Sequence, residues 1–101
     1  MRNPNAKVGE RETSELISLL EKAAKEPGML KKVLTDILTP AELREVTARW
    51  QIVKHLSKGE SHRNVAADLH IGVATVARGT QALAKTSGGF AWLLKAASLR
   101  R

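Results

Sequence analysis

The stretch RNVAADLHIGVATVAR, residues 63–78, decides the fold. It holds two short segments with helical apolar spacing, separated only by His70, Ile71 and Gly72. A helix, a three-residue turn and a second helix form the helix-turn-helix, a motif whose second helix enters the major groove of DNA. We therefore predict a helix-turn-helix over about residues 61–84.

Small and apolar residues inside this stretch are spaced as the motif requires. Ala66 is small where the second helix is expected to cross closest. The turn usually takes Gly at His70 because the backbone there has a positive φ, which His tolerates better than most residues. Gly72 then serves as a weak N-cap for the second helix. The side chains expected to hold the two helices together are Val65, Leu69, Ile71 and Val76.

The start of each helix in the motif carries the candidate DNA contacts. Ser61 is a suitable N-cap, and His62 and Arg63 can donate N–H groups to phosphates or base edges. The second helix offers small, mostly apolar side chains, so readout would depend on thymine methyl groups, water bridges and DNA deformation. Arg63 can alternatively be read as a solvated surface charge. The predicted DNA-contacting residues are Ser61, His62, Arg63, Val73, Ala74, Thr75 and Ala77.

The residues before the motif predict three further helices. Apolar spacing predicts a helix over about residues 13–26, which Pro27 and Gly28 end, and a short one over about residues 29–37. Thr39, Pro40 and Glu42 then form the start signal of a long helix that runs to Ser57, with Gly59 as its left-handed stop. The apolar stripe of this helix is expected to consist of Leu43, Val46, Trp50, Val53 and Leu56.

A last amphipathic segment with Phe90, Leu93, Leu94 and Ala97 follows the break at residues 86–89. The fold class is therefore all-α with six helices, and no strand pattern is found. Residues 1–12 are expected to form a flexible arm. Residues 13–101 are expected to form a single helical domain.

The composition of the chain indicates which kinds of partner and site to expect. Seventeen Lys and Arg against ten Asp and Glu give a net charge of +7 and a pI near 10.3, and residues 61–101 hold six basic residues against one acid. Such a balance favours a polyanionic partner, the alternative being a solvated basic surface. The chain has no Cys, and a metal site would have to rest on three separated His, so we predict none.

Other classes of protein are disfavoured. No apolar run approaches the roughly 20 residues of a membrane span, and no apolar signal region follows the N-terminal charges. We therefore expect a cytoplasmic protein without membrane contact. An enzyme is not expected, because the sequence has no paired-carboxylate cluster, no Gly-rich phosphate loop and no triad-like set of residues.

Four stretches together closely resemble the tryptophan repressor family of bacterial transcription regulators: LTPAE (38–42), ARWQIV (48–53), GES (59–61) and ATVARGT (74–80). The resemblance covers about residues 12–99. It implies an intertwined homodimer of six-helix chains, in which the helix-turn-helix of each chain binds half of a double-stranded operator. It also implies an amino-acid corepressor that binds between the long third helix and the second helix of the motif. This corepressor would hold the helix-turn-helix outward.

Carried over residue by residue, the resemblance implies a ligand site. Arg49 would stack on the aromatic ring of the ligand, Arg78 would pair with its carboxylate, and Gly79 would leave room for it. Two Arg residues suit a planar zwitterion, because a guanidinium both stacks and forms bidentate salt bridges. The residues implied in this site are Leu38, Thr39, Arg49, Thr75, Arg78 and Gly79, the first two from the other subunit.

The sequence departs from the family at three points that bear on the ligand and on DNA. Ala82 stands where tryptophan-binding members place a Ser, the loop after Gly59 is one residue shorter, and Ala66 replaces a Lys that reaches DNA. The departure at Ala82 leaves the identity of the ligand open, and we expect a repressor whose effector is L-tryptophan or a related indole or aromatic carboxylate. The alternatives are a ligand-independent DNA-binding protein of the same superfamily and a basic helical module that binds protein.

Overall fold

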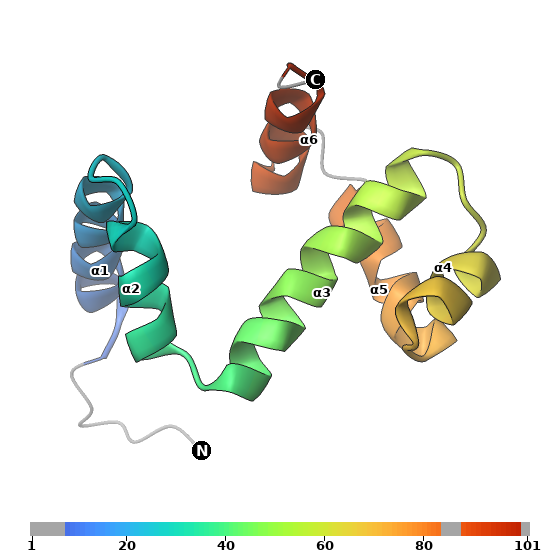
Figure 1. Cartoon of the computed structure of the whole chain (residues 1–101), viewed down its shortest axis with the longest axis horizontal. Helices are drawn as coiled ribbons and strands as arrows, with labels where there is room; N and C mark the ends of the chain where they lie inside the picture. Colours follow the sequence, from blue (N-terminus) through green and yellow to red (C-terminus); the bar gives the residue numbers. More distant parts are fainter. Residues whose placement is uncertain (1–7, 84–87, 100–101) are drawn as a thin grey trace. The chain divides into compact units, whose positions relative to one another are not determined.

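The computed structural model describes residues 8–83 and 88–99, all of whose regular structure is helical (Figure 1). The helices are α1 (Glu10–Ala24), α2 (Met29–Ile37), α3 (Pro40–Ser57), α4 (His62–Leu69), α5 (Val73–Leu83) and α6 (Gly89–Leu99). The prediction of an all-α chain with six helices is thereby confirmed. Residues 1–7 of the predicted arm, and residue 84 at the end of the predicted motif, lie outside the described residues.

The chain divides into two compact units, residues 1–43 and residues 44–101. In the first unit, α1 packs against α2, and the left-handed Gly28 (φ +79°) lies between them as the N-cap of α2. Ala23 is the buried residue of this helix pair. Five large apolar side chains of the pair remain 36–53% exposed in the single chain: Leu16, Ile17, Leu19, Leu30 and Ile37.

The predicted flexible arm, residues 1–12, extends too far into the chain. The helix begins at Glu10 rather than Thr13, so the last three residues assigned to the arm are helical. The cause is local: the Gly9 N–H donates to Glu12 Oε1 at 2.9 Å, and Thr13 Oγ1 donates to the Gly9 carbonyl at 3.0 Å. Because the bond to Glu12 satisfies a backbone N–H that a helix N-terminus leaves unpaired, it extends the helix toward the chain start.

The long helix α3 begins and ends where its sequence signals predict. The Thr39 N–H donates to Glu42 Oε1 at 2.8 Å, and the Glu42 N–H donates to Thr39 Oγ1 at 3.1 Å, which is the reciprocal capping box. Gly59 adopts φ +86° two residues after the last helical residue, Ser57. This left-handed residue reverses the chain toward α4.

The second unit carries most of the buried core. Ile52 of α3 packs with Val65 and Ala66 of α4 and with Val76 of α5, and all four side chains are buried. Leu56, Leu69 and Ile71 cover this cluster. On α3, Trp50 also stacks on Phe90 of α6, with ring centroids 6.3 Å apart. Across the described parts of the chain, no helix is long and apolar enough to cross a lipid bilayer.

Candidate nucleic-acid interface

The helices α4 and α5 form the predicted helix-turn-helix, built on the end of α3 (Figure 1). Val65 and Val76 are fully buried between them, and Leu69 and Ile71 pack against the same cluster. Ala66 is 7% exposed, as expected for the small residue at the crossing. The predicted packing of the two helices is therefore confirmed.

Local hydrogen bonds fix both ends of α4. Ser61 Oγ accepts from the Asn64 N–H at 3.1 Å, so Ser61 is the N-cap. His70 adopts the left-handed conformation, with φ 57° and ψ 46°, and the Ile71 N–H donates to the Ala66 carbonyl at 3.0 Å. His70 thus takes the position that favours Gly, as predicted, and the chain turns within three residues.

The backbone carbonyl of Gly72 accepts the first hydrogen bonds of α5, which begins at Val73. This carbonyl accepts from the N–H groups of Thr75 at 3.1 Å and Val76 at 3.2 Å. An added Cβ at Gly72 would meet nothing closer than Thr75 Oγ1 at 4.0 Å, so space does not require glycine there. In the first turn of α5, Val73, Ala74 and Thr75 are exposed, whereas Val76 is buried.

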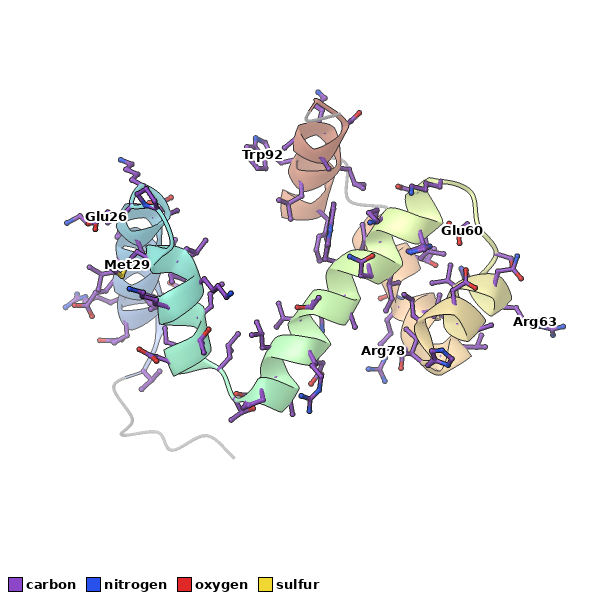
Figure 2. All side chains as sticks on the ribbon, in the orientation of Figure 1. Glu26, Met29, Glu60, Arg63, Arg78 and Trp92 are labelled. Atoms are coloured by element: carbon purple, nitrogen blue, oxygen red, sulfur yellow. The ribbon has the colours of Figure 1, made fainter. Side chains whose placement is uncertain are left out.

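The seven predicted DNA-contacting residues are all exposed on the two helix starts. Figure 2 shows the Arg63 side chain extending away from α4 into solvent. His62 also contacts the other helix of the motif, because its Nε2 lies 2.9 Å from Thr80 Oγ1 on α5. This hydrogen bond links the start of α4 to α5, and no pattern in the sequence indicates it.

The charge of the chain is concentrated in the unit that holds this motif. Residues 44–101 contain ten Lys and Arg against three Asp and Glu, whereas residues 1–43 contain seven of each. The whole net charge of +7 therefore belongs to the second unit. A positive field of this size around an exposed helix start attracts the phosphates of a nucleic acid.

The residues implied in a ligand site fall in both units. Leu38 is half-buried and Thr39 exposed in the first unit. In the second, Arg49, Thr75 and Arg78 are exposed, with Arg49 Nη2 3.0 Å from Glu45 Oε1. The side chain of Ala82 lies outside the described residues.

Gly79 is the contact point between α5 and α3. A Cβ on Gly79 would lie 2.5 Å from Ile52 Cγ2 and 3.3 Å from Leu56 Cδ1. The space left by its missing side chain is therefore filled by α3. Ile52, 2% exposed, is the buried residue that the predicted apolar stripe of α3 left out, while Val46, placed in that stripe, is 46% exposed.

Comparison with known proteins agrees with this geometry. The family model described as Trp repressor protein matches residues 11–98. The relatives include proteins named Trp operon repressor homolog from Vibrio campbellii (41% identical over 56 residues, 54% of this chain) and Aliivibrio fischeri (36% over 83 residues, 80% of this chain). The matched part spans 56% of the length of the first relative and 76% of the second.

These relatives are named as repressors, in agreement with the expectation of a regulator rather than an enzyme. The family match covers the α4–α5 motif, the α3 helix beneath it and most of the remaining chain. The chain belongs to the Trp repressor family.

Proposed function

We propose that this protein is a transcriptional repressor that binds a specific double-stranded operator through α4 and α5. The observation that carries the proposal is the exposed start of α5 on a helix-turn-helix with a fully buried core, within the unit that holds the whole net charge. The names of the relatives support the same function. The alternative of a module that binds protein has no comparable support.

The first prediction concerns Arg63 at the exposed start of α4. Arg63→Ala is expected to lower affinity for the operator by about 1–3 kcal/mol, with little change on random duplex DNA, because a base contact is lost. The measurement is fluorescence anisotropy with a labelled duplex from the upstream region of the protein's own gene and with a scrambled duplex. Arg44→Ala, an exposed change on α3, is the matched control.

Equal losses on the two duplexes would make Arg63 a phosphate contact instead. The same titrations, repeated between about 50 and 200 mM salt, test DNA binding itself, because release of counterions from several phosphates lowers affinity roughly a hundredfold over that range. An affinity that barely changes with salt would contradict the proposed function and favour a module that binds protein.

We further infer that the repressor acts as a homodimer. Large apolar side chains are exposed on α1, α2, α3 and α6, with Trp92 of α6 69% exposed. An apolar pocket on α6 is lined by Gly89, Phe90, Trp92 and Leu93. A chain of this size alone buries too little apolar surface for high stability. We therefore expect a second copy of the chain to cover the exposed apolar side chains.

The second prediction is therefore a solution mass of twice 11.0 kDa, measured by sedimentation equilibrium. Trp92→Glu is expected to weaken the dimer at least about tenfold, because a charge would replace an aromatic anchor at the interface. Lys95→Glu, an exposed change on the same helix, is the control. A monomeric mass for the unaltered chain at micromolar concentration would contradict the inference.

The repressor is proposed to be gated by L-tryptophan or a related indole or aromatic carboxylate. Support comes from Arg49 and Arg78, two guanidinium groups on α3 and α5 of the same unit. A ligand-independent repressor is the second candidate, favoured by the filling of the space at Gly79 by Ile52 and Leu56. Operator titrations with and without L-tryptophan separate the two, since a change below about threefold leaves under ~0.7 kcal/mol of coupling.

A further inference from the structure

Three potential metal ligands converge beside the helix-turn-helix. His55 lies in the last turn of α3, Glu60 in the connection to α4, and Asp68 near the end of α4. One ligand atom from each lies within 4.8 Å of the others. No metal site is predicted from the sequence, because the three His residues are separated along the chain.

The fold holds two of these groups in direct contact. His55 Nδ1 lies 3.0 Å from both carboxylate oxygens of Glu60, and the two side chains are only 22% and 30% exposed. Gly59 makes the contact possible, because its left-handed backbone (φ +86°) turns the chain back toward α3. Asp68 reaches the pair from α4 and is exposed, so the cluster opens to solvent on that side.

Glu60 and Asp68 are two of the few acidic residues in a unit that is rich in Lys and Arg. The second unit has three acidic residues among ten basic ones, and Glu45 is paired with Arg49. The other two acids, Glu60 and Asp68, both lie at His55. Two carboxyl groups and one imidazole supply two oxygen ligands and one nitrogen ligand, a set that suits a divalent cation.

We propose that His55, Glu60 and Asp68 form a binding site for a divalent transition metal ion, with Zn²⁺ as the probe. Bonds of about 2.1 Å in a tetrahedral site place ligands about 3.4 Å apart. His55 Nδ1 and the Glu60 oxygens, 3.0 Å apart, are already near that spacing, and the separations to Asp68, at most 4.8 Å, would have to shorten toward it. Water completes the coordination on the open side, and the imidazole favours a transition metal over Mg²⁺ or Ca²⁺, which prefer oxygen ligands.

An ion at this position ties the end of α3 to α4. The three ligands span the connection at residues 58–61, through which α4 is attached to the long helix. Binding therefore restrains the first helix of the DNA-binding motif at the joint where its pose is set. Since the site is assayed without DNA, a failure of metal binding is distinguishable from a failure of the proposed repressor function.

The test uses the full chain without a histidine tag, cleared of metals with a chelator. Titration with Zn²⁺ by calorimetry, and with Co²⁺ by visible absorption, is expected to give one ion per chain. His55→Gln and Asp68→Asn should each weaken binding at least about tenfold, since even the partners of ligands contribute that much. His70→Asn, a change of an exposed His outside the cluster that keeps a residue tolerant of positive φ, is the matched control.

Thermal unfolding followed by circular dichroism gives a second readout. Zn²⁺ is expected to raise the midpoint of the unaltered chain and of His70→Asn, but not that of the two ligand variants, because an ion that binds only the folded state stabilises it. Absence of saturable binding to the unaltered chain overturns the proposal. So does unchanged affinity in a folded Asp68→Asn variant, or a loss of binding in His70→Asn equal to that in His55→Gln.

Discussion

Replacing Gly79 with valine is expected to lower the free energy of unfolding by about 1–3 kcal/mol, the usual result of overpacking a core. The first added carbon would lie 2.5 Å from Ile52 Cγ2, well inside the van der Waals distance of about 3.5–4.0 Å. Ile52 is a branched side chain that is 2% exposed, so it has little room to move. The helices α3 and α5 must separate instead, which opens the core around Val76.

A double-mutant cycle shows whether this contact is the cause. Gly79→Ala adds helix propensity worth up to about 1 kcal/mol but introduces the same clash. In an Ile52→Ala background, which itself costs about 2–5 kcal/mol, the 2.5 Å clash disappears, and only the milder 3.3 Å contact with Leu56 Cδ1 opposes the gain in propensity. The effect of Gly79→Ala is therefore expected to change sign between the two backgrounds, with a coupling of about 0.5–3 kcal/mol.

Urea unfolding at one fixed protein concentration provides the free energies, because the proposed dimer would make stability depend on concentration. Gln81→Ala, an exposed change on α5, the same helix as Gly79, is the control. That variant should unfold with no loss of stability. Equal effects of Gly79→Ala in both backgrounds would show that the contact with Ile52 does not require glycine at residue 79.

The elements that the sequence predicted well are those with local causes. α2 begins and ends at the expected residues, and Thr39 with Glu42 starts α3 as a capping box. Ser61 caps α4, and His70 adopts the positive φ expected of its turn. Each of these features depends on side chains and backbone groups within about four residues of one another, so the sequence alone contains the information.

The features that the sequence missed depend on contacts between helices. An α3 stripe drawn by periodicity included Val46 and omitted Ile52, because a long helix with apolar residues on several sides does not reveal which side its neighbours cover. The contact between His62 and Thr80 joins residues 18 positions apart. The His55–Glu60 contact, in turn, requires the left-handed turn at Gly59.

The second prediction with a large expected effect concerns Arg78. Arg78→Ala is expected to remove the effect of a carboxylated corepressor on operator affinity, with ligand affinity lowered at least about tenfold, because a charged hydrogen bond contributes roughly 1.5–3 kcal/mol. The side chain is exposed on α5, and Figure 2 shows it projecting from that helix. Its removal leaves no cavity, so the free energy of unfolding should change by less than about 0.5 kcal/mol.

Arg78→Lys separates geometry from charge. Lysine keeps the positive charge but lacks the planar pair of N–H donors that a carboxylate accepts, so we expect part of the ligand affinity to be lost. Arg49→Ala is the companion variant: it also breaks the exposed pair with Glu45, which contributes at most about 1 kcal/mol. Loss of ring stacking should weaken aromatic ligands more than small carboxylates.

A phosphate contact is the competing role for Arg78, and the same titrations test it. If Arg78 binds a phosphate, Arg78→Ala weakens DNA binding without ligand, on operator and random duplex alike, and lowers the salt slope by about 1. If it binds the corepressor, affinity without ligand is unchanged and only the response to L-tryptophan or an indole acid disappears. A variant with weaker DNA binding and an intact ligand response would therefore contradict the corepressor role.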